Sequence, residues 1–578
     1  MRPREDLLGK LRDGAAEGVV MIIGGGINGV GVFRDLARQG VPSLLVERGD
    51  FASGTSAAPS RLIHGGLRYL ETGEFALVRE SVEERNLLLL NAPHQVRPLP
   101  VWIPTFSWAG GAFAAGLRFL RLKRSPGPKG AAVVRLGLGI FDRFGEFHRT
   151  MPKHRAIPIA EARARFPGLA PSVKAVLEYY DARISSPERL TVELVGDAER
   201  DCPEAMAIPY LAVDGRDGAA VRLRDTITGE TFRVAPRLIV NCAGAWVDPV
   251  DGALGIPERL TGGTKGSHLV LDRPDLAAAL GEAMLYFETH DHRACLVYRL
   301  DGGKVMLGTT DLRTEDAEGA ICSEAEIDYL FGVLEEVLPG SAPRREEIVF
   351  TVAGVRPLPR SAAGATGAIS RDHSLRRFEP GPDRPFPVLT LVGGKWTTYR
   401  ACAAQIADAV LAELGRSRRE DTRALPIGGG AGFPREPSGR DRFARDLAEG
   451  ASLAPERAAL LLGRYGTTAV GVAAACAGRF TPVAGAGTYS VEEIRWILAE
   501  ERATRLDDLV LRRTLIGFDG LASATTVRAL GLIMAESLGW SAERRAEEVA
   551  RCLTLLARRH HVVENEPDAE DHAQYAIG

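Results

Sequence analysis

The clearest pattern of apolar and polar positions lies near the start of the chain. Residues 19–23 form an unbroken apolar run of strand length that leads into a cluster of glycines. A helix-compatible segment follows as far as Gly40, and residues 43–46 form a second apolar run that ends at Glu47. Short apolar runs on either side of a glycine turn and a helix are typical of a buried parallel unit. The pattern therefore predicts a strand–helix–strand unit over residues 18–47.

The middle of the chain favours strands, and the end favours helices. Short β-rich runs alternate with turns over residues 208–242, and residues 285–310 and 347–360 are also rich in strand formers. A helix is predicted over residues 396–414. Residues 415–440 are rich in Gly, Pro and Arg, which indicates a linker. Beyond the linker, the apolar residues recur at helical spacing.

A capping box marks one helix start in this last part. Ser490 and Glu493 have the S-x-x-E spacing in which a hydroxyl and a carboxylate satisfy main-chain N–H groups of the first turn. Ile494, Ile497 and Leu498 follow at helical spacing. We therefore expect a helix at Ser490 in which both side chains cap the main chain.

An uncharged stretch near residue 100 raises the question of a membrane. Residues 98–117 are 20 uncharged residues, the length of a spanning helix, but prolines at one end and glycines at the other argue against one. Residues 112–124 combine apolar positions with Arg118, Arg121 and Arg124. A basic stripe beside an apolar face suits a helix lying in the headgroup plane. The alternative is an ordinary surface helix of a cap domain.

Composition narrows the class of protein. The 578 residues are 45% hydrophobic, an ordinary globular value that excludes wholesale disorder. The net charge of −3 provides no basic field for nucleic acid. The seven cysteines are scattered and contain no C-x-x-C pair, so we expect neither a disulfide framework nor a metal site. The N-terminal segment has no apolar core, so we expect no secretory signal and a catalytic site that faces the cytoplasm.

The glycine turn carries a nucleotide-binding motif. Gly24, Gly26 and Gly29 match G-x-G-x-x-G, with Asn28 inside the motif. Such glycines permit a tight turn and a close approach of pyrophosphate to a helix N-terminus. Glu47 follows Gly24 by 23 positions and is placed to accept hydrogen bonds from ribose hydroxyls, which disfavours NADP. The motif leaves both FAD and NAD open.

Two further segments favour FAD. Residues 54–70 are rich in glycine and hydroxyls, which suits an extended segment under a flavin ring. Residues 391–400 open a helix with glycines and hydroxyls, and a helix N-terminus stabilises negative charge on a reduced flavin. Residues 239–246 add a third glycine turn. The candidate FAD-binding residues in these segments are Thr55, Ser56, Ser60, His64, Gly65, Gly66, Gly244, Gly394, Lys395 and Thr397.

Together the motifs resemble a known family. IIGGGINGVG, TSAAPSRLIHGGLRYLE, GTKGSH, GTTD, GVRPL, ISRDH and GGKWTTYR occur in this order between residues 22 and 400. The chain resembles the FAD-dependent glycerol-3-phosphate dehydrogenases, the aerobic, quinone-reducing type of the D-amino-acid-oxidase-like superfamily. The resemblance extends over residues 18–560. It departs at Pro59 and Arg61, where the family has serine and lysine, at Trp396, where it has leucine, and over 103–155, which is longer.

The resemblance implies an α/β fold with a Rossmann-like FAD-binding domain, an inserted β-rich substrate domain and a C-terminal all-helical cap domain. FAD-binding segments are expected at 18–92, 172–247 and 352–414, an insertion with the candidate membrane-surface helix at 93–171, the substrate domain at 248–351, the linker at 415–440 and the helical domain at 441–565.

The resemblance also implies a pocket for a phosphorylated polyol. Such a substrate carries about two negative charges and needs several cations in fork geometry. Arg68, Tyr69 and Arg371 are the expected substrate-binding residues, and Arg356 and Lys395 are expected at the reacting end. Any one of the 64 arginines can be a solvated surface charge. Lys395 is one of only 8 lysines, so this explanation is weaker for it.

Oxidation of a secondary alcohol moves hydride from carbon to flavin N5 while a base takes the hydroxyl proton. We expect His268 to be that base or a proton relay, because an unperturbed pKa near ~6.5 suits neutral pH. The alternative is a structural histidine that holds the glycine-rich loop. Arg356 would orient the hydroxyl and polarise the forming carbonyl.

The expected reaction is oxidation of sn-glycerol 3-phosphate to dihydroxyacetone phosphate, with electrons passed to a membrane quinone. Three alternatives stay open, namely oxygen as acceptor, another phosphorylated polyol such as erythritol phosphate, and a flavin-bearing sensor or tRNA-modifying protein. We expect the protein in the cytoplasm, peripheral on the anionic inner face of the cell membrane. A homodimer stays open, and no nucleic-acid partner is expected.

Overall fold

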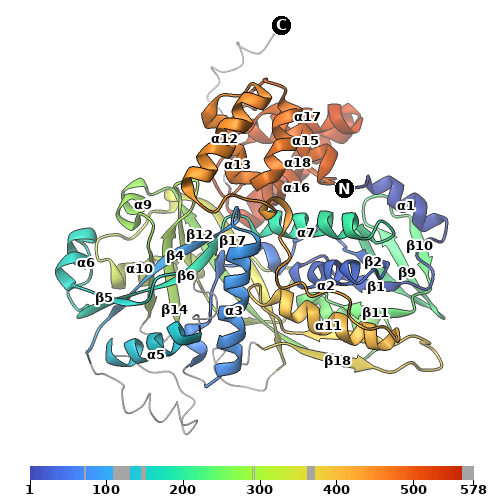
Figure 1. The fold of residues 1–578 in the computed structure, drawn as a ribbon, viewed down its shortest axis with the longest axis horizontal. Helices are drawn as coiled ribbons and strands as arrows, with labels where there is room; N and C mark the ends of the chain where they lie inside the picture. The colour runs from blue at the N-terminus through green and yellow to red at the C-terminus, as the bar shows by residue number, and fades with distance from the viewer. Residues whose placement is uncertain are drawn as a thin grey trace.

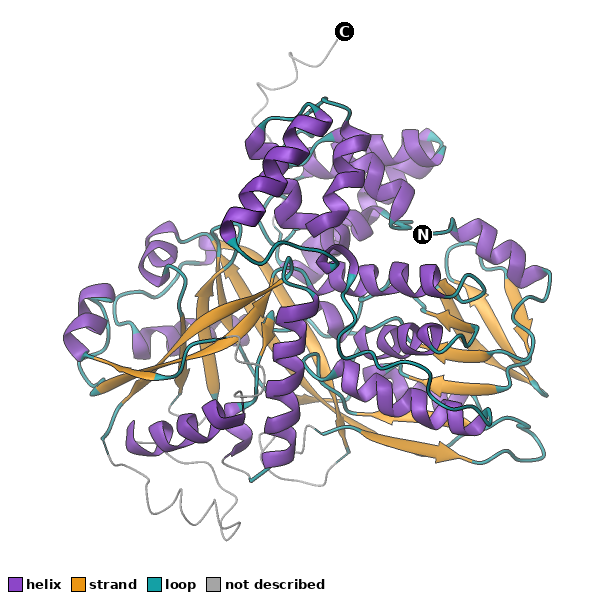
Figure 2. Ribbon diagram, viewed as in Figure 1, coloured by secondary structure: helices purple, strands orange, loops and turns teal. Residues whose placement is uncertain are grey.

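In a computed structural model, the chain folds into two sheet-based parts and a helical domain above their junction (Figures 1 and 2). The structure describes residues 1–70, 73–108, 131–144, 151–289, 291, 293–360 and 372–562. This arrangement confirms the predicted fold class. Residues 112–124, for which a membrane-surface helix is predicted, lie outside the described residues.

A six-stranded sheet forms the nucleotide-binding part, in the order β18-β19-β11-β1-β2-β7. Its strands pair in parallel, except that β18 runs antiparallel to β19. The predicted strand–helix–strand unit supplies its centre, because β1 and β2 are neighbours. The strands are β1 (Val20–Ile23), β2 (Ser43–Val46), β7 (Met206–Ile208), β11 (Leu238–Asn241), β18 (Ser374–Phe378) and β19 (Val388–Val392).

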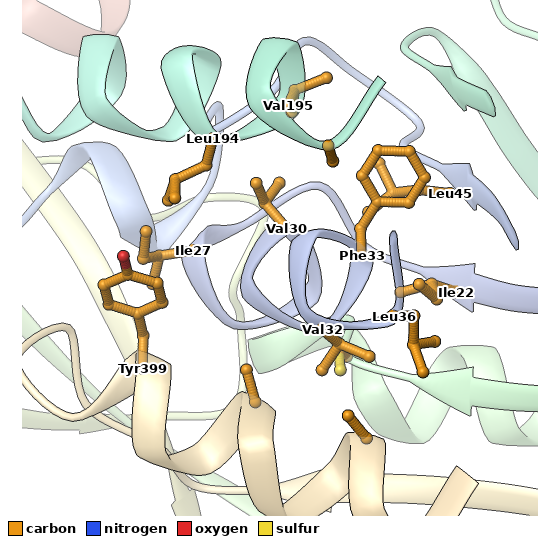
Figure 3. Packing of buried hydrophobic residues seen from close by; sticks show 14 of the residues in the cluster. Ile22, Ile27, Val30, Val32, Phe33, Leu36, Leu45, Leu194, Val195 and Tyr399 are labelled. Atoms are coloured by element: carbon orange, nitrogen blue, oxygen red, sulfur yellow. The ribbon is translucent and has the colours of Figure 1, made fainter. Parts of the chain in front are cut away.

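Alternate residues of these strands build two different cores. Ile22 and Leu45 pack against α2, α7 and α11, where Phe33 of α2 is buried completely (Figure 3). Met21 and Leu44 face the other side, towards α1 and a small antiparallel sheet. Both faces are covered, which is why the strands read as continuous apolar runs. The covering elements are α1 (Arg4–Arg12), α2 (Ile27–Arg38), α7 (Pro187–Asp201), α8 (Val247–Ala253), α11 (Tyr399–Glu413), β8 (Leu211–Asp217), β9 (Ala220–Asp225) and β10 (Thr231–Val234).

The second part is a ten-stranded sheet in which β12 and β17 run antiparallel along the site. In β12, Leu269 faces the core that holds α6, α9 and α10, whereas Val270 faces the core that holds α3, α5 and the helical domain. The strands are β3 (Leu62–Ile63), β4 (Val96–Thr105), β5 (Arg155–Ile157), β6 (Ala175–Ile184), β12 (Thr261–Leu271), β13 (Met284–Glu288), β14 (Ala294–Arg299), β15 (Val305–Gly308), β16 (Leu312–Thr314) and β17 (Ile348–Pro359). The helices are α3 (Phe75–Asn91), α5 (Ala131–Phe144), α6 (Ile159–Arg165), α9 (Pro274–Leu280) and α10 (Glu324–Val337).

The helical domain follows the linker. Its segment Pro455–Cys476 is long and apolar enough to cross a membrane, with mean hydropathy 1.3, but 44% of the apolar window is buried inside the fold. A buried bundle helix meets the same criterion, so this segment alone gives no topology. The helices are α12 (Pro437–Ala451), α13 (Pro455–Tyr465), α14 (Ala469–Cys476), α15 (Val491–Glu500), α16 (Leu506–Asp508), the π-helix η9 (Leu509–Arg513), α17 (Ala524–Leu538) and α18 (Ala542–His560).

Two strands, β6 and β17, belong to segments predicted for the FAD-binding domain but lie outside its six-stranded sheet. Residues 172–247 and 352–414 are predicted as parts of the FAD-binding domain, but β6 pairs with β4, and β17 pairs with β12. Both strands therefore belong to the ten-stranded sheet. The residue pattern of a buried strand carries no local signal of which sheet the strand joins.

The capping box at Ser490 is half formed. The hydroxyl of Ser490 accepts the Glu493 N–H at 3.2 Å, as predicted. The Glu493 carboxylate does not return to the main chain of Ser490. It is fully buried and accepts hydrogen bonds from Arg457, Arg464 and Tyr465 instead. Tertiary partners replace the local one because a buried carboxylate needs cations.

Candidate active site

One cavity of about 1860 Å³ runs between the two sheets and reaches the helical domain. A cavity of this size exceeds the usual range for one small ligand, about 300–1,000 Å³. It brings together residues that lie far apart along the chain. Of the predicted site residues, Gly24, Gly26, Asn28, Glu47, Thr55, Ser56, Ser60, His64, Gly66, Tyr69, Gly244, His268, Arg356, Gly394, Lys395 and Thr397 line it.

The glycines of the first turn leave no room for side chains. Gly24 has φ +109°, and a Cβ there would lie 2.6 Å from the carbonyl oxygen of Cys242. A Cβ on Gly29 would overlap the carbonyl oxygen of Gly24. The strand, the turn and the start of α2 therefore approach closely, as a pyrophosphate-binding turn requires. Gly29 itself is not on the cavity wall, so its role is to allow this packing.

Glu47 is held by the main chain around it. Its Oε2 accepts the Gly25 N–H at 2.7 Å, and its Oε1 accepts the Gly49 N–H at 2.8 Å. Burial raises the pKa of Glu47, and these two hydrogen bonds oppose that shift. A carboxylate oxygen has more than one lone pair, so both oxygens can still accept ribose hydroxyls.

Two polar side chains at the start of α2, Ser56 and Asn28, line the cavity. Ser56 accepts the Ile27 N–H at 3.0 Å, so the hydroxyl sits at the helix N-terminus. The Asn28 side-chain oxygen is buried and has no hydrogen-bond partner among the described residues. The glycine turn, the acceptors of Glu47 and this Asn28 oxygen fit a dinucleotide such as FAD.

A second glycine turn closes the cavity near α11. Gly394 has φ +104°, and a Cβ there would lie 2.8 Å from the Asn28 amide nitrogen. Thr397 is buried beside this turn, and α11 begins at Tyr399. The Lys395 ammonium lies 3.8 Å from the centre of the Tyr69 ring, a cation–π contact that fixes the lysine against the cavity wall.

The segment before Tyr69 is shaped by glycine as well. Gly66 has φ +75°, and the Tyr69 ring packs so closely over it that a Cβ would overlap the ring. The His64 and Tyr69 ring centres are 6.3 Å apart. The Gly65 N–H donates to Asp181 at 2.8 Å, and Gly65 is buried behind the cavity wall. Gly65 therefore anchors this turn to β6.

His268 lies on β12 and is almost completely buried. Its Nε2 is 2.7 Å from the hydroxyl oxygen of Ser60, and its Nδ1 is buried without a hydrogen-bond partner among the described residues. Burial and the charge of Arg356 lower the pKa of His268 from 6.5 to about 3. The expectation of an unperturbed pKa is therefore wrong, and this imidazole is neutral at pH 7. Ser60, predicted to contact FAD, is the hydroxyl that connects His268 to the cavity.

Arg356 lies on β17 and pairs with Thr264 of β12, four residues before His268 on that strand. Its guanidinium donates to Asp311 at 3.1 Å and to the Thr309 hydroxyl at 3.3 Å. Gly266 makes room for it, because a Cβ there would overlap the guanidinium group. The side chain is thus held flat against β12 by the turn that follows β15.

A buried carboxylate that the sequence analysis did not single out supports this end of the site. Glu326 of α10 accepts hydrogen bonds from Ser267 at 2.8 Å and Thr310 at 2.7 Å, and it pairs with Lys265 at 2.7 Å. It therefore ties the strand of His268 to the turn that holds Arg356. The available signal was the S-x-x-E spacing of Ser323 and Glu326, which form a capping box at the start of α10.

Several predicted residues are not placed in the site by the structure. Arg371 lies outside the described residues, and the side chain of Arg68 is not described. Within the described part of the chain, no group of three His, Cys, Asp or Glu side chains could hold a metal ion. All seven cysteines are described, and each is buried and without a disulfide bond.

Comparison with known proteins agrees with this architecture. Residues 20–408 match the family "FAD dependent oxidoreductase", and residues 420–545 match the "C-terminal domain of alpha-glycerophosphate oxidase". The chain is 36% identical to a glycerol-3-phosphate dehydrogenase of Synechocystis sp., covering 72% of this chain and 74% of that protein. It is 32% identical to a D-erythritol 1-phosphate dehydrogenase of Brucella abortus, covering 86% and 93% respectively.

A solved structure shares the whole fold. The glycerol-3-phosphate dehydrogenase of Bacillus halodurans, determined with FAD, superimposes with a TM-score of 0.72 at 22% identity and covers 96% of this chain and 97% of its own. The two family matches together extend over most of the chain, including the helical domain. The chain belongs to the FAD-dependent oxidoreductases, in the glycerol-3-phosphate dehydrogenase family, and its cofactor is FAD.

Proposed function

We propose that the protein oxidises sn-glycerol 3-phosphate to dihydroxyacetone phosphate and passes the electrons to a membrane quinone. The observation that carries this proposal is the meeting of Ser60, His268 and Arg356 on the wall of the cavity that begins at the nucleotide turn. FAD, when bound, supplies the acceptor for the hydride. Relatives named as glycerol-3-phosphate dehydrogenases support the choice of substrate.

The neutral His268 suits a relay for the hydroxyl proton. Ser60 lines the cavity, whereas the Nδ1 of His268 is buried, so the proton would pass from the substrate hydroxyl to Ser60 and from Ser60 to Nε2 of His268. A neutral imidazole can accept it without first losing a proton. A bound phosphate dianion would raise the pKa of His268, because an opposite charge favours the imidazolium form.

Cationic groups would hold the anionic substrate. Arg356 lines the cavity in fork geometry, which suits a hydroxyl or a carbonyl that gains negative charge. Lys395 lines the cavity from the opposite glycine turn. We assign the phosphate mainly to Arg371, a proposal that rests on the ISRDH sequence motif. Glycerol without phosphate tests it, because Arg371→Ala should narrow the preference for the phosphorylated substrate.

The electron acceptor is proposed from the family resemblance and from the pattern of residues 112–124. A basic stripe beside apolar residues would bring the protein to the anionic inner face of the membrane, where a quinone is available. Binding to anionic vesicles should then weaken with salt. If the enzyme consumes oxygen, forms peroxide and reduces no quinone, the electron acceptor is oxygen and not a quinone.

A second substrate candidate is D-erythritol 1-phosphate. The relative that carries this name is 32% identical over 86% of the chain, close to the 32% over 88% of a glycerol-3-phosphate dehydrogenase of Mycobacterium bovis. Both substrates would present a phosphate and a secondary alcohol to the same groups. They differ in chain length.

The deciding experiment is anaerobic reduction of the purified holoenzyme. Stoichiometric glycerol 3-phosphate should bleach the visible flavin band within the time of one catalytic turnover. Glycerol should not bleach it. Faster bleaching by erythritol 1-phosphate would favour the second candidate. No bleaching by either phosphate would contradict the proposed function. Acid precipitation should release FAD into the supernatant, which checks that the starting protein is loaded.

A further inference from the structure

A buried ionic cluster joins the helical domain to the loop that follows β2. The carboxylate of Asp50 accepts two hydrogen bonds from Arg513, at 2.6 and 2.9 Å, and one from the Nε of Arg512 at 2.7 Å. All three side chains are buried. Although burial alone would raise it, the charges of Arg513 and Arg512 hold the pKa of Asp50 below its ordinary value. Asp50 is therefore a carboxylate that two cations of another domain keep ionised.

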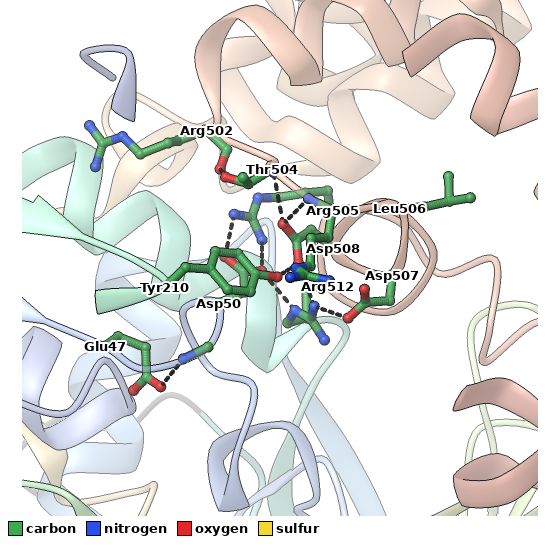
Figure 4. Close-up of polar contacts among 12 residues, drawn as sticks. Glu47, Asp50, Tyr210, Arg502, Thr504, Arg505, Leu506, Asp507, Asp508 and Arg512 are labelled. Carbon is green, nitrogen blue, oxygen red and sulfur yellow. Dashed lines mark hydrogen bonds and ion pairs between the residues drawn. The ribbon is translucent and has the colours of Figure 1, made fainter. Parts of the chain in front are cut away.

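The two arginines reach Asp50 together because of local backbone geometry. Both end the π-helix η9, a wider turn that recurs at functional sites and here lets consecutive residues serve one carboxylate. Arg512 also donates to Asp507 at 2.7 Å and to Asp508 at 2.5 Å (Figure 4). The cations thus have counter-charges on both sides of the domain boundary.

Asp50 belongs to the same short loop as Glu47. The Glu47 carboxylate accepts the Gly25 N–H at 2.7 Å, and the Ala52 N–H donates to the carbonyl oxygen of Gly25 at 3.0 Å. The loop is therefore tied to the glycine turn at two points. A displacement of Asp50 would move the carboxylate of Glu47 relative to that turn.

A second connection runs through Tyr210. Its hydroxyl donates to Asp508 at 2.5 Å, and its main-chain N–H donates to the carbonyl oxygen of Gly49 at 2.7 Å. Leu211 donates to the carbonyl oxygen of Glu47 at 2.7 Å. Two separate contacts of the helical domain, one through Asp50 and one through Tyr210, thus end on the main chain beside Glu47 (Figure 4).

We propose that the helical domain positions the Glu47 loop for the ribose of FAD through Asp50 with its two arginines and through Tyr210, and so sets how long the cofactor stays bound. Arg512 and Arg513 are positioning residues that act through Asp50. This inference depends on the role of Glu47 in binding FAD, but it is independent of the substrate.

The test compares two buried ion pairs across the same domain boundary. Asp50→Asn keeps the shape of the side chain and removes its charge. Glu199→Gln does the same to a buried carboxylate of α7 that accepts two hydrogen bonds from Arg502, at 3.0 and 2.8 Å. Among the described residues, Glu199 makes no hydrogen bond to the Glu47 loop. The rate of FAD release is followed as the rise in flavin fluorescence on dilution of the holoenzyme, and thermal unfolding is recorded with and without FAD.

We expect Asp50→Asn to release FAD at least tenfold faster than the wild type, and Glu199→Gln to stay within about twofold of it, at a similar loss of thermal stability of the apoprotein. If the two variants release FAD at equal rates, the ionic cluster affects FAD only by stabilising the packing of the two domains, and the proposal is overturned. Glu47→Gln tests separately the premise that Glu47 binds FAD. If it leaves FAD release unchanged, the role of Glu47 fails; if it accelerates release while Asp50→Asn does not, the positioning by Asp50 fails.

Tyr210→Phe covers the case in which Asp50→Asn does not fold. It removes only the hydroxyl that donates to Asp508 and leaves every charge in place. A two- to fivefold faster release of FAD supports the proposal, and wild-type release contradicts it. Arg513→Lys keeps the charge but loses the fork, so it should give an effect between those of Asp50→Asn and the wild type.

Discussion

The two ends of the cavity differ in the groups that form their walls. At the nucleotide end, main-chain geometry and one carboxylate within residues 24–47 form the wall. At the substrate end, side chains from β12, β17 and two distant glycine turns meet. The first end depends on space for the backbone, and the second depends on charges placed by the sheet. Substitutions should therefore separate cofactor retention from turnover.

The largest effect is expected at Gly29. A Cβ in Gly29→Ala would overlap the carbonyl oxygen of Gly24, so the start of α2 must move away from the turn. Overpacking of this kind costs about 1–3 kcal/mol, and we expect FAD affinity to fall on the order of 100-fold. Titration of the apoprotein with FAD measures it. Gly252→Ala in α8 is the control, because no atom lies within 4 Å of its Cβ.

Arg356→Ala tests the other end. Loss of a charge-assisted hydrogen bond costs roughly 1.5–3 kcal/mol, so kcat/KM should fall about 10- to 150-fold, with a lower kcat. FAD release should stay at the wild-type rate. Arg360→Ala, an exposed arginine at the end of the same strand, should leave turnover unchanged. A loss of FAD in Arg356→Ala would mean that the two ends are not separable.

Tyr69→Leu should have a smaller effect. It removes the ring over which the Lys395 ammonium lies at 3.8 Å. A cation–π contact contributes about 0.5–2 kcal/mol, so kcat/KM should fall about 2- to 30-fold. Tyr69→Phe keeps a ring and should retain most of the activity. If Tyr69→Phe loses as much activity as Tyr69→Leu, the hydroxyl rather than the ring holds Lys395.

The last effect is on the pH dependence of stability, through His268. The folded state lowers its pKa from 6.5 to about 3, so the unfolded chain binds more protons between these values and the contribution to stability is lost as pH falls below 6.5. From pH 6.5 to 5 the wild type should lose about 1–2 kcal/mol more than His268→Gln. Urea unfolding of both proteins at the two pH values measures the difference. Parallel losses would mean that His268 is charged in the folded protein.

The sequence predicts the fold and the nucleotide end better than the side-chain contacts of the site. The βαβ unit, the FAD preference and the fold class follow from residue spacing and motif order, and they are confirmed. The partners of Ser60 and Glu493 do not follow. His268 lies 208 positions from Ser60, and Glu493 exchanges its expected capping contact for side chains brought close by folding. Glu326 escaped notice because its S-x-x-E spacing predicts only a helix start, not the strand and turn that it joins.

The sequence by itself determined the nucleotide turn, where Gly29 approaches the carbonyl oxygen of Gly24 and Glu47 accepts the N–H of Gly25, all within one strand–helix–strand unit. Such short-range geometry depends on residue type and spacing alone. Only the tertiary structure decided the neutral state of His268 and the pairing of Asp50 with Arg513, which is 463 positions away. Both depend on which distant segments exclude water from a charge, and the exclusion of water has no local signature in the chain.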